Sequence, residues 1–342
     1  MKIGIVGYQS AGKSSLFQFL TGVPADPALA HTTQTANALV PDPRVPRLTE
    51  IYQPKKITLA ALTFVDTPGL ARSHEGSAAK LALIREAGCL LVVVGAFGGA
   101  DPRKDLQSFE EDLLIADLDI VAGRVERLRE SVKKPRPNRE AELLELEMLE
   151  PVLAQLESGK ALRELTLSSE QARAIKSFQL LTDKPRFTLL NTADDPADPA
   201  AYLAQQQVSG PAAAFSVSLN LDLANMPDEE RETFCQEMGL RAYDRGELLR
   251  QIMLASGQML FFTAGEKEVR TWMIRCGGTA EEAAAGIHSD LAKGFVRAET
   301  MTCDDLFAAG SEREVKARNQ MRKEARNYVI QDGDVLHILA NT

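Results

Sequence analysis

The sequence predicts an α/β protein: a parallel β-sheet covered by helices, interrupted by a helical hairpin and followed by a smaller domain. Three observations support this fold class. Short apolar strands run into glycine-containing loops, two long leucine stripes flank a proline turn, and from about residue 256 the pattern changes to short strands and glycine turns. We expect residues 1–104 and 182–255 to form a discontinuous first domain, with an insertion at 105–181 and a last domain at 256–342.

The composition is that of an ordinary soluble globular protein. The chain has 342 residues, enough for two or three domains, and 44% of them are hydrophobic and 25% charged. A net charge of −9 argues against a general polyanion binder, although a local basic patch could still contact nucleic acid. The four cysteines are far apart and form no C-x-x-C pair, so neither a disulfide framework nor a zinc site is expected.

No segment predicts membrane insertion. The longest apolar run, Cys89–Val94, is far shorter than the roughly 18 residues that a spanning helix needs, and it is typical of a buried strand. Met1-Lys2 leads directly into an apolar strand rather than a signal peptide. We therefore expect a cytoplasmic protein with no membrane partner.

Residues Gly7–Ser14 fit the phosphate-loop pattern G-x-x-x-x-G-K-[ST] at every position. The apolar strand Ile3–Val6 precedes the loop and a helix-like stretch, Ser15–Leu20, follows it. Lys13 would bring a positive charge to the β- and γ-phosphates, and the Ser14 hydroxyl would ligate Mg²⁺. The alternative is a chance glycine-rich turn, which the combined strand, loop and helix disfavour. The predicted domain is therefore a P-loop nucleoside triphosphatase that binds a purine nucleotide, ATP or GTP, with Mg²⁺. The predicted phosphate-binding residues are Gln9, Ser10, Ala11, Gly12, Lys13, Ser14, Ser15 and Gly69.

A second anchor follows the buried-strand run Leu62–Val65. Asp66 ends this strand and would orient Mg²⁺ through water, and the N–H group of Gly69 is suited to the γ-phosphate. Alone, Asp66–Gly69 would be an unremarkable turn. The threonine that senses magnesium should lie between the phosphate loop and Asp66. The run His31–Thr35 lies in this interval, and within it we favour Thr33 as the third metal-binding residue.

A third strand, Phe187–Leu190, runs into Asn191-Thr192-Ala193-Asp194. In GTPases an N-K-x-D motif here reads guanine, so Asn191 and Asp194 are the predicted base contacts; a plain turn is the alternative. A further strand over Phe215–Ser218 would place Ser218 in the last base-contacting loop.

The long insertion has two apolar stripes with helical spacing. They consist of Leu106, Phe109, Leu113, Ala116 and Ile120, and of Leu146, Leu149, Leu153 and Leu156. The break at Lys133–Asn138 predicts an antiparallel helical hairpin. The stripes could pack only on the parent domain, but the dense charge on the opposite faces favours a projecting arm. Ser168–Gln171 could cap a further helix.

The last domain has few residues of catalytic type. Thr271–Arg275 alternates as a strand, Thr279–Leu291 has a helical pattern, and Val335–Leu339 closes the domain after the turn at Asp332–Asp334. This order predicts a small β-grasp fold.

Several stretches resemble the Obg-like ATPase (YchF) family. Phe261–Arg270, Ile287–Asp290, Gly294–Glu299 and Asn327–Asp334 look like that family's C-terminal TGS domain. Val40–Arg44 and Ala116–Leu118 fit its first switch and its arm. The resemblance implies a Ras-like domain, a helical hairpin and a TGS domain. It also implies slow hydrolysis, ribosome association and, in many members, a preference for ATP.

This chain departs from the family at several positions. The family's phosphate loop usually has Pro-Asn-Val at Gln9–Ala11, and the missing asparagine at Ser10 argues against potassium-stimulated hydrolysis. The family commonly has Ala where Thr67-Pro68 stands and Glu where Asp194 stands. Asp194 is the guanine-type residue, whereas Thr192 is not the guanine-type lysine, so the choice between ATP and GTP stays open.

Turnover should be slow because Leu70 follows Asp66–Gly69 where Ras-like enzymes keep a water-orienting glutamine. His74 is a candidate for orienting water, with an exposed switch histidine as the alternative.

Two functions fit these motifs. The first is a slow regulatory nucleotide switch that cycles on the ribosome or another large assembly, and the second is a hydrolysis-deficient nucleotide-binding scaffold. A basic cluster in the last domain could bind phosphate groups, with a solvated helix face as the alternative. The family resemblance favours contact of this cluster with ribosomal RNA, in addition to contact through the hairpin. The basic cluster consists of Arg313, Lys316, Arg318, Arg322, Lys323 and Arg326.

Overall fold

The computed structural model describes residues 1–26, 28, 32–72, 77–240 and 242–341. The chain divides into two compact units. The first consists of Met1–Ala36 and Thr63–Tyr243, and the second of Asn37–Leu62 and Asp244–Thr342. The chain therefore passes three times between the units, after Ala36, after Leu62 and after Tyr243.

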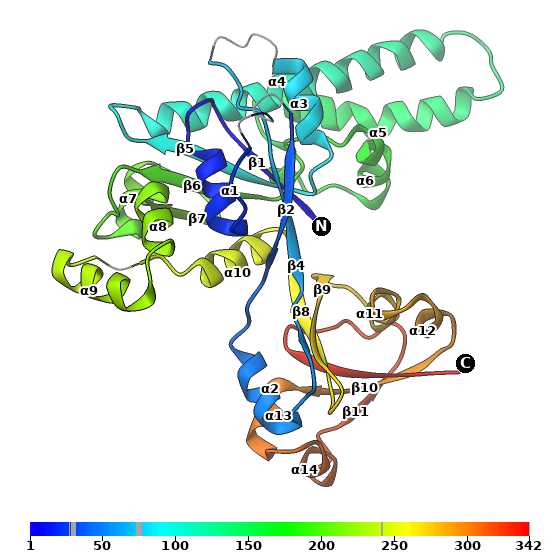
Figure 1. The fold of residues 1–342 in the computed structure, drawn as a ribbon. Helices are drawn as coiled ribbons and strands as arrows, with labels where there is room; N and C mark the ends of the chain where they lie inside the picture. Colours follow the sequence, from blue (N-terminus) through cyan, green and yellow to red (C-terminus); the bar gives the residue numbers. More distant parts are fainter. Residues whose placement is uncertain (27, 29–31, 73–76, 241, 342) are drawn as a thin grey trace. The chain divides into compact units, whose positions relative to one another are not determined.

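The first unit is built on a sheet with the strand order β2-β4-β1-β5-β6-β7 (Figure 1). The neighbours β1 and β4, β1 and β5, β5 and β6, and β6 and β7 are parallel. Its strands are β1 Lys2–Val6, β2 Gln34–Leu39, β4 Ala61–Asp66, β5 Cys89–Ala96, β6 Arg186–Thr192 and β7 Ala212–Phe215. The end of β2 from Asn37 and the start of β4 up to Leu62 fall in the segment assigned to the second unit. Its helices are α1 Lys13–Thr21, α3 Ser77–Arg85, α4 Pro102–Ser131, α5 Arg139–Glu157, α6 Ser169–Ile175, α7 Pro199–Gln205, α8 Val217–Ala224 and α9 Asp228–Met238, with short 3₁₀ turns η2 Leu162–Glu164 and η3 Lys176–Phe178.

The predicted α/β class is confirmed, and the parallel sheet explains where the polar motifs meet. The middle strand β5 is buried over Cys89–Val94 because helices cover both faces of a doubly wound sheet. The carboxyl ends of β1, β4 and β6 share one edge, since these strands are parallel. Chain order reverses beside β1, and ligands of such sheets bind at this switch point.

One prediction about the strands was wrong. The strand expected at Phe215–Ser218 ends at Phe215, because the Ser216 side chain caps α8 by accepting a hydrogen bond from Leu219 N at 3.4 Å. A serine that precedes an apolar helix favours the N-cap over a strand continuation.

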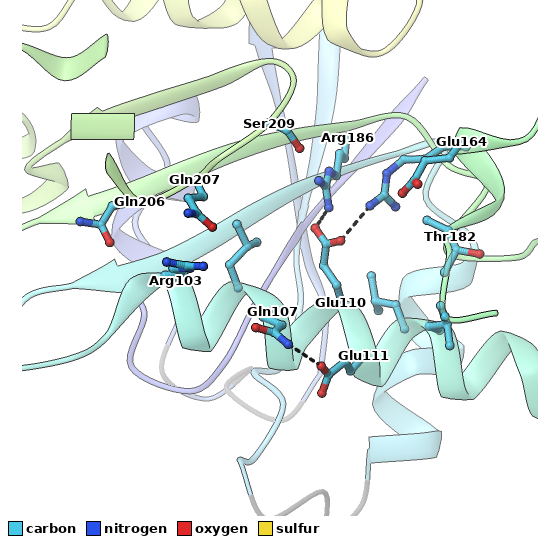
Figure 2. Close-up of a pocket in the computed structure, with 16 residues that line it drawn as sticks. Arg103, Gln107, Glu110, Glu111, Glu164, Thr182, Arg186, Gln206, Gln207 and Ser209 are labelled. Carbon is cyan, nitrogen blue, oxygen red and sulfur yellow. Dashed lines mark hydrogen bonds and ion pairs between the residues drawn. The ribbon is translucent and has the colours of Figure 1, made fainter. Parts of the chain in front are cut away.

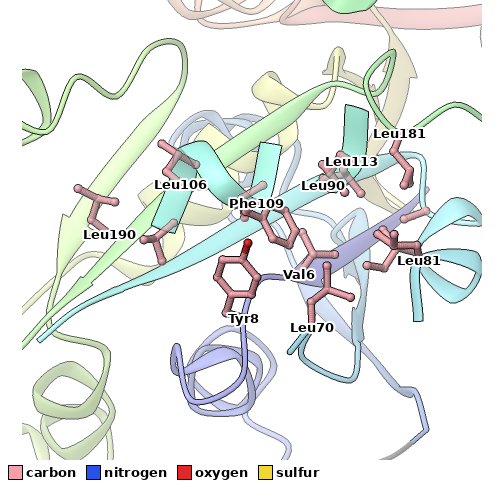
Figure 3. Packing of buried hydrophobic residues seen from close by; sticks show 14 of the residues in the cluster. Val6, Tyr8, Leu70, Leu81, Leu90, Leu106, Phe109, Leu113, Leu181 and Leu190 are labelled. Carbon is pink, nitrogen blue, oxygen red and sulfur yellow. The ribbon is translucent and has the colours of Figure 1, made fainter. Parts of the chain in front are cut away.

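Helix α4 belongs to two cores. Its first turns insert Leu106, Phe109 and Leu113 into the cluster beneath the sheet, which also contains Val6 and Tyr8 (Figure 3). Its outer turns pack against α5 and α6 in a separate cluster. That second cluster consists of Val121, Val125, Leu128, Leu149, Val152, Leu153, Leu156, Leu162, Ile175 and Leu180. The first stripe therefore packs largely on the parent sheet, and only the outer part of the hairpin has a core of its own. The predicted capping box at Ser168 and Gln171 is present at the start of α6.

The second unit has a mixed sheet with the order β11-β10-β12-β8-β9-β3. A parallel pair, β12 and β8, lies between the antiparallel pairs β10–β12 and β8–β9, as the predicted β-grasp fold requires. Its strands are β3 Ile57–Thr58, β8 Gln258–Ala264, β9 Val269–Arg275, β10 Phe295–Thr302, β11 Arg322–Glu324 and β12 Asp334–Ala340. Its helices are α2 Arg44–Tyr52, α10 Arg245–Ala255, α11 Ala280–Ile287, α12 Ser289–Lys293, α13 Cys303–Ala309 and α14 Glu312–Ala317. The helix expected at Thr279–Leu291 is broken at His288, whose backbone is extended.

The segment Asn37–Leu62 belongs to the second unit, although the sequence placed it in the nucleotide-binding domain. Val45 and Leu48 of α2 join the core that contains Phe262. The Arg44 guanidinium bonds to Asp42 at 2.8 Å and to Asp332 at 2.7 Å, so ion pairs fix the segment across 288 residues of chain. Residues 244–255, which the sequence also placed in the first domain, cluster with this unit as well.

Candidate functional site

A cavity of about 600 Å³ opens at the carboxyl-terminal edge of the first sheet. It combines residues from the loop after β1, the end of β6, the turn after β5 and the start of α8. Its lining residues are Ser10, Gly12, Lys13, Ser14, Ser15, Phe97, Asn191, Thr192, Ala193 and Ser218. Most predicted phosphate-loop residues and two of the three predicted base residues therefore lie around one cavity.

The loop between β1 and α1 has a conformation that only some residues tolerate. Gly7 has φ +142°, and a Cβ there would lie 2.2 Å from the Val93 carbonyl oxygen. A Cβ on Gly12, with φ +95°, would lie 2.1 Å from the Asn191 amide nitrogen. Ser10 has φ 62°, which costs a non-glycine residue about 1–2 kcal/mol. Asparagine, the residue that the family resemblance leads us to expect at this position, adopts that conformation more readily.

Lys13 begins helix α1 and is almost fully buried, with 7% of its surface exposed. Its amine donates a hydrogen bond to the Tyr8 carbonyl oxygen at 2.7 Å. Burial lowers the pKa of Lys13 to about 8; the negative charge of Asp66 opposes this shift and the positive charge of Lys80 adds to it. A buried amine with one neutral acceptor is well suited to receive an anion.

Ser14 and Asp66 meet directly. The Ser14 hydroxyl donates to Asp66 Oδ2 at 2.7 Å, and burial raises the pKa of the Asp66 carboxyl. The other oxygen, Oδ1, is buried and has no hydrogen-bond partner among the described residues. An unpartnered carboxylate oxygen beside a hydroxyl fits a hydrated Mg²⁺ ion, which binds through one or two carboxylates plus phosphates rather than an all-protein cage. The described residues contain no cluster of three or more His, Cys, Asp or Glu side chains that could hold a metal ion.

Thr33 is exposed and comes immediately before β2. It is not among the described residues that line the cavity. The structure therefore brings Ser14 and Asp66 together but does not place Thr33 with them.

The segment after Asp66 is tied to the phosphate loop by its backbone. Leu70 N donates to Gly7 O at 3.1 Å and Gln9 N donates to Leu70 O at 3.0 Å. Gly69 lies so close to the phosphate loop that a Cβ on this residue would be 2.7 Å from the Lys13 amine. Thr67 has a structural role, since its hydroxyl donates to Ile5 O at 2.6 Å.

Lys80 is a positively charged residue at this site that the sequence analysis did not select. Its amine donates to the Gly69 carbonyl oxygen at 2.8 Å, from helix α3. Its only sequence signal is a lysine on the helix that follows the second anchor.

His74, the residue predicted to orient water, lies outside the described residues.

The predicted base residues differ in their environment. Both polar atoms of the Asn191 side chain form hydrogen bonds with the backbone. Nδ2 donates to Ala11 O and Oδ1 accepts from Val217 N, each at 3.0 Å. It therefore fixes the phosphate loop to the start of α8. Asp194 is exposed, whereas the next residue, Asp195, accepts from Ser216 N at 2.6 Å. Ser218 lines the cavity.

Phe97 also lines the cavity and was missed from sequence. It is 38% exposed and sits in the turn after β5, just before Gly98 and Gly99, which both have positive φ. An exposed aromatic side chain beside the cavity offers a stacking surface for a nucleotide base. The sequence feature that could have identified Phe97 is an aromatic residue between a buried strand and two glycines.

The phosphate loop is also connected to the base of helix α4. Tyr8 donates from its hydroxyl to Asp112 Oδ2 at 2.9 Å, and its ring packs edge-on against Phe109 at 5.7 Å (Figure 3). Arg72, after the second anchor, lies 5.3 Å from the Tyr8 ring centre and pairs with Asp105 at 2.5 Å. Burial and the Asp112 hydrogen bond raise the pKa of Tyr8, so the phenol stays protonated.

Among the described residues, no helix is long and apolar enough to cross a membrane.

The comparisons with known proteins agree with this architecture. Residues 2–122 match the family model described as "50S ribosome-binding GTPase", and residues 259–341 match YchF-GTPase_C, described as a protein of unknown function (DUF933). The chain is 34% identical to the "Ribosome-binding ATPase YchF" of Escherichia coli O157:H7, over 99% of both chains. It is also 34% identical to "Obg-like ATPase 1" of Oryza sativa subsp. japonica, covering all of this chain and 92% of the relative.

A solved structure supports the same assignment. The YchF GTPase of Schizosaccharomyces pombe superimposes with a TM-score of 0.81 at 27% identity, covering 99% of this chain and 97% of that one. Full-length similarity, the two family models and the shared fold agree, and the chain belongs to the YchF family of Obg-like ATPases.

Proposed function

We propose that this protein is a Mg²⁺-dependent purine nucleoside triphosphatase that turns over slowly and acts as a regulatory switch on the ribosome. The observation that carries the proposal is the convergence of Lys13, Ser14 and Asp66 at a glycine-shaped loop beside an open cavity. The printed names of the relatives, a ribosome-binding ATPase and an Obg-like ATPase, support it.

The phosphate loop would bind the β- and γ-phosphates through its backbone N–H groups and the start of α1. Lys13 would exchange its bond to Tyr8 O for the phosphate oxygens, because a charged acceptor holds a buried ammonium better than a carbonyl does. Gly69 would donate its N–H to the γ-phosphate, and Lys80 would hold the Gly69 peptide in that orientation.

Ser14 and Asp66 would hold Mg²⁺, with Thr33 as a third residue supplied by the segment before β2. The ion would neutralise the charge that develops on the phosphates. The unpartnered Oδ1 of Asp66 is the structural feature that supports this assignment.

Slow turnover follows from the residue that replaces the water-orienting glutamine. Leu70 has no exposed surface and packs in the core with Val6 and Tyr8, so it offers no polar group to an attacking water. With positioning and charge neutralisation intact but no water-orienting side chain there, the chemical step should be slow.

Both ATP and GTP remain candidate substrates. Phe97 would stack on either base, and Ala193 offers no side-chain hydrogen bond. Asp194 is the exposed residue that could accept hydrogen bonds from guanine.

Single-turnover hydrolysis with ATP and GTP, with and without Mg²⁺, tests the proposal. We expect slow Mg²⁺-dependent cleavage that is lost in Ser14→Ala. Tight nucleotide binding without cleavage, both alone and with ribosomes, would instead identify a hydrolysis-deficient scaffold. Absence of nucleotide binding would reject both functions.

A further inference from the structure

We propose that a second pocket in the first unit binds a small soluble anion through a carboxylate or phosphate group. The pocket has a volume of about 450 Å³ and lies between the start of α4, η2, the start of β6 and the segment after α7 (Figure 2). It shares no lining residue with the nucleotide cavity. Arg186 begins β6 and Asn191 lies near its end, so the two cavities are separated by about 17 Å of strand.

Two arginines in this pocket share one carboxylate. Arg163 Nη2 lies 3.0 Å from Glu110 Oε2, and Arg186 contacts the other oxygen of Glu110 (Figure 2). The side chains of Arg163 and Arg186 are only 21% and 15% exposed. The three groups together have a net charge of +1 in a half-buried site, where the exposed Glu164 also acts on Arg163.

The guanidinium donors are also largely unused. Each guanidinium has five N–H groups, and Glu110 is the only acceptor that the described residues provide for either side chain. Burial lowers the pKa of both arginines, so an added anion would relieve the cost of keeping both charged. Bidentate binding of carboxylate or phosphate is the interaction for which a guanidinium is best shaped.

The other charged groups of the pocket lie at its rim. Arg103, Glu111 and Glu164 are exposed, and Glu111 accepts a hydrogen bond from Gln107 at 2.9 Å. Solvent and salt screen these rim charges more than the inner ones. Polar, uncharged groups complete the wall and suit the remainder of a small metabolite: Gln206, Gln207 and Ser209.

The test uses the full-length protein saturated with MgADP, so that the phosphate loop is already filled. The melting temperature is measured against inorganic phosphate and against succinate at constant ionic strength. Phosphate should stabilise the wild type, and a succinate response would show that carboxylates bind as well. A response to neither probe would overturn the proposal.

Glu110→Gln sharpens the test because it removes the internal competitor for both arginines. Leaving two half-buried cations without a partner should lower the melting temperature by about 4 °C or more. Phosphate should then restore much of this loss, with an affinity on the order of tenfold above that of the wild type. Glu150→Gln is the matched control, since Glu150 forms an exposed pair with Arg129 at 3.0 Å.

Arg186→Gln provides a second variant if Glu110→Gln does not fold. It leaves Arg163 and Glu110 as a neutral pair, so the phosphate response should disappear. An equal response in wild type, Arg186→Gln and Glu150→Gln would place the anion elsewhere and overturn the proposal. A Glu110→Gln protein that phosphate does not rescue would show that the triad is only structural.

Discussion

At the scale of single residues, the ionisation of Lys13 connects the fold to phosphate binding. The pKa of Lys13 in the nucleotide-free protein is about 8, well below its usual value of 10.5. Phosphate would stabilise the charged amine and raise that pKa again. Binding above pH 8 therefore requires proton uptake, whereas binding below pH 8 does not.

We predict that nucleotide affinity is nearly constant from pH 6.5 to 7.5 and falls above pH 8, by up to about tenfold per unit. Titration of a fluorescent nucleotide analogue across pH 6.5–9.5 measures this dependence. Lys13→Ala should abolish binding at every pH. An affinity that stays constant to pH 9.5 would mean that Lys13 remains charged throughout.

Lys80 is predicted to affect the chemical step more than substrate binding. Losing its bond to Gly69 O should free the peptide that faces the γ-phosphate and lower kcat about tenfold, with KM little changed. Lys80→Met and the conservative Lys80→Arg should differ, the latter keeping part of the rate. Lys2→Met, which removes an exposed pair with Glu86, is the control. Equal kcat in all four proteins would remove Lys80 from the site.

Asp194 is predicted to determine base choice without stabilising the fold. It is exposed, so Asp194→Glu should shift the ratio of GTP to ATP affinity towards ATP while the melting temperature stays constant. Asp195→Ala should lower the melting temperature and leave the ratio of GTP to ATP affinity unchanged, because Asp195 accepts hydrogen bonds from Ser216 N and from Asn220. Calorimetry with both nucleotides measures the ratio, and an unchanged ratio in Asp194→Glu would exclude Asp194 from the base site.

At the scale of elements, helix α4 is divided between the parent sheet and the hairpin. Phe109 packs beneath the phosphate loop, whereas Val125 packs against α5. The helix also contacts both anchors of the nucleotide site, through the bonds of Asp112 to Tyr8 and of Asp105 to Arg72. Removing the whole insertion from residue 105 would therefore remove part of the parent core.

Removing only the outer turns of the hairpin separates its contribution to ribosome binding from the contribution of α4 to the parent core. We predict that replacing residues 127–145 with a short Gly-Ser bridge leaves nucleotide affinity within about twofold and weakens co-sedimentation with ribosomes. Among the buried residues of the hairpin core, this deletion removes only Leu128. Loss of nucleotide affinity would show that the hairpin tip supports the nucleotide site, and unchanged sedimentation would exclude the tip from ribosome contact.

At the scale of the whole molecule, acidic partners offset half of the positive charges of the basic cluster. Lys316 pairs with Glu312 at 2.8 Å, Arg322 with the fully buried Asp334 at 3.3 Å, and Arg326 with Glu281 at 3.0 Å. The three remaining basic residues have no ion pair within the described residues. They are Arg313, Arg318 and Lys323.

We predict that Arg318→Gln with Lys323→Gln weakens ribosome binding and flattens its salt dependence by about one unit of slope per lost contact. Lys316→Gln, whose charge Glu312 already offsets, should have little effect and is the control. Sedimentation over a range of salt concentrations measures the slope. A wild-type slope in the double variant would mean that this surface does not contact RNA. Arg322 is a poor probe, since its loss would leave Asp334 without a cationic partner.

Much of the first unit could be predicted from sequence because its signals are local. The glycines of the phosphate loop, the strand that precedes Lys13 and the strand that ends at Asp66 each depend on neighbouring residues. The leucine stripe of α4 was ambiguous for a physical reason: helical spacing defines an apolar face but does not identify the surface that covers it.

By itself, the sequence predicted the family, the α/β class, the phosphate loop with its flanking strand and helix, and the two long helices of the hairpin. Only the tertiary structure decided which polar atoms face one another. It placed both ends of the Asn191 amide on the backbone, Lys80 on the Gly69 carbonyl, and two arginines on Glu110. It also assigned Asn37–Leu62 to the second unit, through Arg44 and Asp332. These contacts join residues that are distant in the chain, and the partner of a side chain depends on how strands and helices pack rather than on its sequence neighbours.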